Sequence, residues 1–188
     1  IAASARELVC DSVILSVGLI PENELALSLG VPVDPVTKGP FIDQGMHTLV
    51  DGIFACGNCV HVADLVDHVS ESGSLAGANA ASYALGERHR RTLVPVVAQG
   101  PLAYVVPQYI DVASAQARAD CFFRVRRTMA HGGTLQTGFG TEILMRERYD
   151  ALRPPEMQRF GIGWGALEMT AKQADSCSVC LEEAADGQ

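Results

Sequence analysis

Two compact apolar runs that end in glycine mark the first half of the chain, at residues 13–18 and 53–57. A short apolar run of this kind predicts a strand that is buried on both faces, as in a parallel sheet. Between the two runs, residues 22–30 predict a short helix, because proline and acidic residues precede its apolar positions and glycine ends them. A proline-free stretch over residues 67–85, followed by Gly86, predicts a long helix.

The pattern changes near residue 93. β-branched and aromatic residues then gather in short segments separated by glycine and proline, at 94–97, 103–110, 121–126, 142–146 and 160–169. Such segments predict strands. We therefore expect an α/β region over residues 1–93, a small antiparallel β domain over 94–172 and, from its polar and acidic composition, a mobile tail over 173–188.

Composition narrows the class of protein. Of the 188 residues, 48% are hydrophobic and 19% are charged, which is typical of a globular chain. The net charge of −8 and the lack of a basic stripe argue against nucleic acid as a partner. No apolar run approaches the roughly 18 residues of a membrane span, so membrane insertion is not expected. Six cysteines without dense spacing suggest a reducing compartment, and we expect a cytoplasmic location.

Two Cys-x-x-Cys pairs occur, Cys56–Cys59 and Cys177–Cys180. Either could be a redox dithiol, and the two together could make a metal-binding module. The alternative is that all four cysteines are structural. The first pair favours this alternative, because it lies within a tight turn that has another explanation.

That turn follows the second apolar run. Gly57 has no Cβ and lets backbone approach a ligand closely, and Asn58 can both donate to and accept from a hydroxylated chain. The long helix then begins near Asp67, where unpaired N–H groups and the helix dipole favour negative charge. His61 and His68 flank this edge and could move a proton. Asp67 could cap the helix.

The residues around this turn resemble a known family. Residues 48–58 read Thr-x-x-x-Gly-Ile-Phe-Ala-x-Gly-Asn and residues 18–23 read Gly-x-x-Pro-x-Asn. In this order they resemble the second flavin motif, and the segment before it, of the FAD/NAD(P)-dependent pyridine nucleotide-disulfide oxidoreductase superfamily. The resemblance implies an α/β fragment of a flavoprotein with two dinucleotide-binding domains, followed by a small β-rich domain.

Asn58 departs from the family, which usually has Asp at this position. With His61 and residues 64–67, it resembles the branch that contains subunits of hydrogen cyanide synthase, dye-linked proline dehydrogenase and sarcosine oxidase, and flavoproteins associated with glycerol-3-phosphate dehydrogenase. Residues 104–108 and 123–127 resemble the carboxy-terminal domain of the last of these.

The resemblance implies FAD as cofactor, contacted by Gly57, Asn58, Cys59, Val66, Asp67 and His68. The chain has no Gly-x-Gly-x-x-Gly loop for a dinucleotide pyrophosphate, so residues outside this chain would bind NAD(P) and the rest of FAD. Electrons would then pass between NAD(P)H or a small organic substrate and an acceptor such as a partner subunit. No catalytic residue follows from the sequence. A non-catalytic interaction module with a vestigial flavin half-site remains the alternative to an enzyme.

Overall fold

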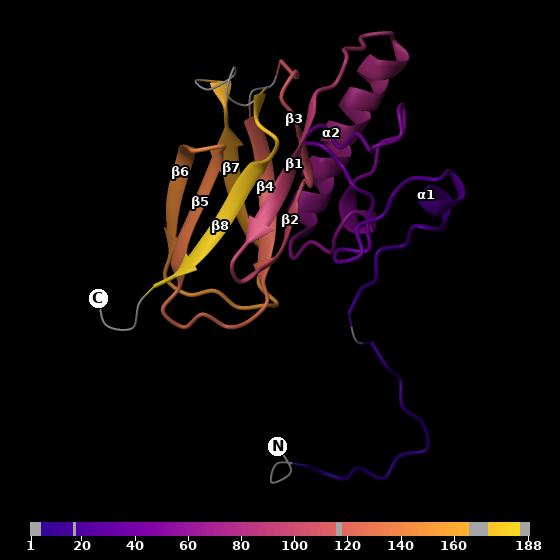
Figure 1. The fold of residues 1–188 in the computed structure, drawn as a ribbon. Helices are drawn as coiled ribbons and strands as arrows, with labels where there is room; N and C mark the ends of the chain where they lie inside the picture. The colour runs from indigo at the N-terminus through magenta and orange to yellow at the C-terminus, as the bar shows by residue number, and fades with distance from the viewer. Residues whose placement is uncertain (1–4, 17, 116–117, 166–172, 185–188) are drawn as a thin grey trace.

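The computed structural model describes residues 5–16, 18–115, 118–165 and 173–184. A loop-rich region carries helix α1 (Glu24–Ser28), the 3₁₀ turn η2 (Gly57–Cys59) and helix α2 (Val66–Ala84), and two β-sheets follow it (Figure 1). The predicted long helix is therefore confirmed, displaced by one residue at each end. The predicted short helix is also confirmed, but it is shorter, because α1 has only five residues. Within the described residues, no helix is long and apolar enough to span a membrane.

The first predicted strand is absent from the described residues. Residues 5–16 run as an extended chain away from the rest of the molecule (Figure 1), and Ile14 is 93% exposed. Val17, within the same predicted strand, lies outside the described residues. A buried strand needs hydrogen-bonding neighbours on both sides, and no described strand lies beside this segment. The second apolar run forms only an isolated bridge, between His47 and Phe54, before η2 begins.

The β-rich region is a sandwich of two sheets. The five-stranded sheet has the order β3 (Tyr109–Asp111), β1 (Leu93–Gln99), β8 (Cys177–Glu183), β5 (Gly133–Phe139) and β6 (Glu142–Tyr149). The three-stranded sheet has the order β2 (Leu102–Val106), β4 (Arg118–Val125) and β7 (Gln158–Gly163). The core between them is mainly apolar and contains large buried aromatic side chains, including Phe123, Phe139 and Trp164.

Two expectations for this region are wrong. The stretch after residue 173 was predicted to be mobile, but Cys177–Glu183 is strand β8, which lies between β1 and β5. Its alternating residues Cys177, Val179 and Leu181 are buried, and this burial outweighs the polar composition of the stretch. The sheet is also not purely antiparallel, because β1 and β8 pair in parallel. Residues 166–169 of the last predicted strand and residues 185–188 lie outside the described residues.

Buried polar contacts join the loop-rich region to the sandwich. The Gln44 side chain exchanges hydrogen bonds with the backbone of Asp111, accepting from its N–H at 2.8 Å and donating to its carbonyl at 2.9 Å. Gln108 donates to the Asp34 carboxylate at 3.1 Å. Because these partners are buried and lie 67 and 74 residues apart in sequence, they hold the loop segment that carries Asp34 and Gln44 against the sandwich.

Candidate functional site

The η2 turn is tied directly to the first turns of α2. Gly57 has a φ of +67°, which favours glycine. Its N–H donates to the Ser72 hydroxyl at 3.0 Å, and that hydroxyl donates to the Val69 carbonyl at 2.8 Å. A Cβ at Gly57 would also lie 3.2 Å from Val69 Cγ1. The turn and the helix therefore form one continuous edge.

The two residues after Gly57 have different roles. The Asn58 Oδ1 accepts from the Ala63 N–H at 3.1 Å, and its Nδ2 has no partner among the described residues. The Cys59 thiol donates to the Cys56 carbonyl at 3.0 Å, and burial raises its pKa. A thiol with a raised pKa is not an activated nucleophile. The geometry thus leaves the Asn58 amide available to a ligand and favours a structural role for Cys59.

The start of α2 is exposed and has no side-chain cap. Leu65 occupies the N-cap position, and Val66 is 75% exposed. The expectation that Asp67 caps the helix is wrong, because it lies in the first turn and accepts no backbone N–H there. The N–H groups of the first turn are consequently left for solvent or a ligand. Their location, next to η2, is what an acceptor on a bound cofactor would need.

His61 and His68 pack on the same aromatic ring. Their ring centroids lie 5.5 Å and 5.0 Å from that of Phe122. In both residues Nδ1 is buried and has no partner among the described residues. Burial, and secondarily the positive charge of Arg124, lower the pKa of His61 to about 4, so its ring is neutral near pH 7. The pair lies beside η2, as the sequence predicted.

A small cavity of about 20 Å³ lies between these elements, lined in part by Gly57, His61 and His68. It has room for roughly one water molecule. It is therefore too small to hold an aromatic ring system. Val66 and Asp67 do not line it and face outward on the edge of η2 and α2.

Asn23 is a site residue that sequence reasoning did not single out. It is 8% exposed, and its Nδ2 donates to the carbonyls of Lys38 at 2.7 Å and Cys59 at 2.9 Å. The asparagine that ends the first motif therefore holds the turn of the second. This contact joins the two motifs physically. Asn23 is the last residue of the Gly-x-x-Pro-x-Asn pattern, so the sequence did contain a signal for it.

Arg124, from strand β4, holds the loop before α2. Its Nε donates to the Tyr104 hydroxyl at 2.9 Å, and its Nη2 donates to the Val62 carbonyl at 3.2 Å and forms an ion pair with Asp64. Asp64 in turn accepts from the Met157 N–H at 2.6 Å. The sandwich therefore positions the loop that carries His61. In the sequence this residue was one of a basic run and gave no indication of that role.

The second Cys-x-x-Cys pair does not converge on a metal site. Cys177 is fully buried and Cys180 is partly exposed in strand β8, and residues three apart in a strand face opposite sides of the sheet. Within the described residues, no group of three or more His, Cys, Asp or Glu side chains is arranged to bind a metal ion. This geometry is evidence against the metal-binding alternative.

Comparison with known proteins gives one match. The model of the family described as pyridine nucleotide-disulphide oxidoreductase matches residues 1–117, which is more than half of the 188-residue chain. No curated protein and no solved structure gives a match. The matched span includes η2, α2 and Asn23, continues past the predicted boundary at residue 93, and ends before β4.

Proposed function

Because the chain belongs to the pyridine nucleotide-disulphide oxidoreductase family, we propose that the edge made by η2 and the start of α2 binds FAD in an oxidoreductase. The observation that carries this proposal is the juxtaposition of three features. They are the Gly57 turn, the Asn58 amide and the uncapped N–H groups at Val66 to His68. These features fit the ribityl chain and pyrimidine side of a flavin, whose acceptors and hydroxyls such donors bind.

When bound, FAD would supply two-electron redox chemistry. The residues of this chain would do three things around it. The Asn58 Nδ2 would donate to a ribityl hydroxyl, and the first-turn N–H groups of α2 would stabilise the negative charge of the reduced pyrimidine edge. His68, whose Nδ1 is buried, would donate a hydrogen bond to the cofactor from Nε2. No described residue is proposed as the group that reacts with substrate.

The finer parts of this function rest on the family resemblance. We propose that NAD(P)H or a small organic substrate is the electron donor and that a partner subunit is the acceptor. Polypeptide outside this chain would provide the Gly-x-Gly-x-x-Gly loop for the FAD pyrophosphate, since the sequence has none. We also propose a cytoplasmic location. Asn58 and His61 further support membership in the branch that contains subunits of hydrogen cyanide synthase and dye-linked proline dehydrogenase.

The experiment uses the native protein with any subunits that co-purify. We expect a visible flavin spectrum and FAD released on denaturation. Val66→Glu places a carboxylate at the exposed first turn, where it favours the helix but repels a reduced flavin. It should preserve folding, weaken binding of the reduced flavin by about tenfold and so make the flavin reduction potential more negative.

Ser70→Glu is the matched control, because it adds the same charge one turn later at an exposed position of α2. It should leave both flavin properties unchanged. A colourless native protein that does not bind added FAD would refute the proposal. Equal effects of the two variants would remove α2 from the flavin site.

The surface also favours a second candidate function, that of an interaction module. Apolar side chains are strongly exposed in the described part of the chain before η2, with Val9 at 103%, Ile14 at 93% and Leu25 at 83% exposure. Exposed apolar surface of this kind marks contact with another polypeptide. Co-purification of a stable partner with no flavin in either chain would support this candidate over the first.

A further inference from the structure

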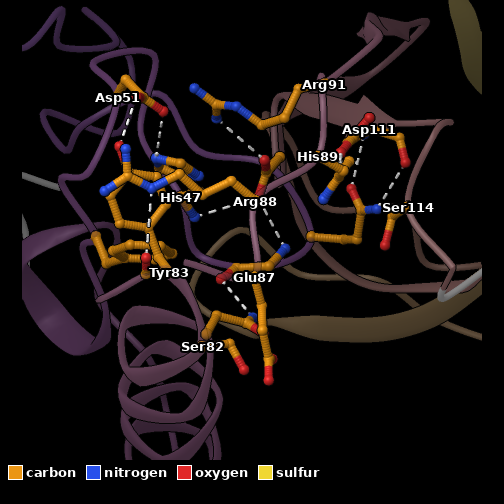
Figure 2. A pocket seen from close by; sticks show the side chains of 15 residues that line it. His47, Asp51, Ser82, Tyr83, Glu87, Arg88, His89, Arg91, Asp111 and Ser114 are labelled. Atoms are coloured by element: carbon orange, nitrogen blue, oxygen red, sulfur yellow. Dashed lines mark hydrogen bonds and ion pairs between the residues drawn. The ribbon is translucent and has the colours of Figure 1, made fainter. Parts of the chain in front are cut away.

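A larger cavity, of about 240 Å³, lies at the other end of α2. Its wall comes from the end of that helix, the loop around His47 and the segment that leads into β1 (Figure 2). It shares no lining residue with the cavity beside η2. Its volume is below the roughly 300 Å³ at which pockets for drug-sized ligands begin, so it suits a small molecule.

The buried acidic groups in this wall already have partners. The Asp43 carboxylate accepts from the N–H groups of Gly45 at 2.8 Å and His47 at 3.1 Å, and from Arg91 at 3.2 Å. The Asp111 carboxylate lies 2.5 Å from His89 Nε2 and accepts from the Thr92 N–H at 2.8 Å. Neither carboxylate is therefore left to attract a cation into the cavity.

His47 offers a neutral donor. Its ring stacks on Phe54 with centroids 4.3 Å apart, and its Nε2 accepts from the Gly52 N–H at 2.9 Å. Burial, and then the charge of Arg91, lower its pKa to about 4. The ring is thus neutral near pH 7 and carries its proton on Nδ1. The 3.7 Å approach of Nε2 to Asp51 is then not an ion pair.

Two arginines in the wall have unused nitrogens. The Arg88 guanidinium lies 4.1 Å from the centre of the Tyr83 ring, and its Nε makes a weak 3.4 Å contact with the Tyr83 carbonyl. Its two terminal nitrogens have no partner within the described chain. Arg91 bonds to Asp43 and to the Thr48 carbonyl through Nη1 alone. The cavity wall therefore carries guanidinium donors that the described chain does not use.

We infer that this cavity is a binding site for a small organic anion, whose carboxylate or phosphate group bonds to Arg88 and Arg91 beside His47. Guanidinium groups match the oxygen pairs of both kinds of anion. The exposed carboxylates of Asp51 and Glu87 at the same cavity disfavour polyanions such as nucleoside triphosphates. The site is independent of the proposed flavin edge, since it uses none of the same residues.

The test is a titration of the native protein with acetate, succinate and inorganic phosphate, by calorimetry and by the imidazole NMR signals of His47. We expect at least one probe to bind and to shift those signals. Arg88→Gln should weaken the best probe by about tenfold, which is the effect of losing one charged hydrogen bond. It should not disturb the fold, because Arg88 is exposed.

Arg90→Gln is the matched control. It removes the same charge two residues away, from an exposed side chain that does not line the cavity, and should leave binding unchanged. A preference for phosphate or for carboxylate would support the site and identify the bound group. Failure of every probe to bind, equal weakening by both variants, or binding without a change at His47 would overturn the inference.

Discussion

Asn23 gives the sharpest test of how the two sequence motifs are joined. Its Nδ2 donates two short hydrogen bonds, to Lys38 at 2.7 Å and to Cys59 at 2.9 Å, from a side chain that is 8% exposed. Each such bond contributes about 1 kcal/mol net, so Asn23→Ala should cost about 2 kcal/mol locally. Asn23→Asp keeps the size but puts a carboxylate oxygen against two carbonyl oxygens, and should cost at least as much.

Hydrogen exchange and flavin retention measure the effect. The Leu27 N–H donates to the Asn23 carbonyl and the Gly30 N–H donates to the Leu27 carbonyl. Both variants should increase the exchange of these N–H groups, because Asn23 holds the start of α1. Both variants should also release FAD from the native protein more readily, and Asn23→Asp should do so at least as much as Asn23→Ala. The control is Asn79→Ala, which loses one 2.8 Å hydrogen bond to Gly45 in a region away from η2. If Asn23→Asp is milder than Asn23→Ala, the side chain acts through its volume and the donor argument fails.

Two further predictions concern the loop beside η2. His61 has a native pKa of about 4 against an ordinary 6.5, so the unfolded chain binds more protons, and stability should fall as pH drops from about 6.5 to about 4. Urea unfolding should show His61→Gln removing up to about 3 kcal/mol of that fall, and identical slopes in both proteins would contradict the assignment. Arg124→Met should lower the free energy of unfolding by about 2 kcal/mol, because it removes the part-buried hydrogen bonds to Tyr104 and Val62; the half-exposed pair with Asp64 adds little. Arg118→Met, which breaks an exposed 3.4 Å pair, should cost under about 1 kcal/mol, and an equal cost would refute the special role of Arg124.

Local patterns predicted what local forces determine. The long stretch without proline before Gly86 gave α2 to within a residue, and the β-branched segments gave most of the sandwich strands. The tight turn at Gly57 was also identifiable, because its backbone has a conformation that only glycine adopts readily. In each case the decisive interaction lies within a few residues of the signal.

Contacts between distant segments were not predictable in the same way. The strand expected before Gly18 depends on neighbours that the described residues do not provide, and the anion site joins Arg88 to a loop some forty residues earlier. Strand β5 begins at Gly133, and its glycines concealed it. β8 could have been found, because Cys177, Val179 and Leu181 alternate inward, but its acidic neighbours outweighed that pattern.

The position of β8 has a consequence for how the protein is made. It is the last described strand in the sequence, yet it lies between β1 and β5, with β1 about eighty residues earlier. During synthesis, the edges of β1 and β5 that pair with β8 therefore have no partner until Glu183 has left the ribosome. Open edges of this kind recruit other chains. The nascent protein should accordingly depend on chaperones most strongly in the interval between the synthesis of β5 and the synthesis of β8.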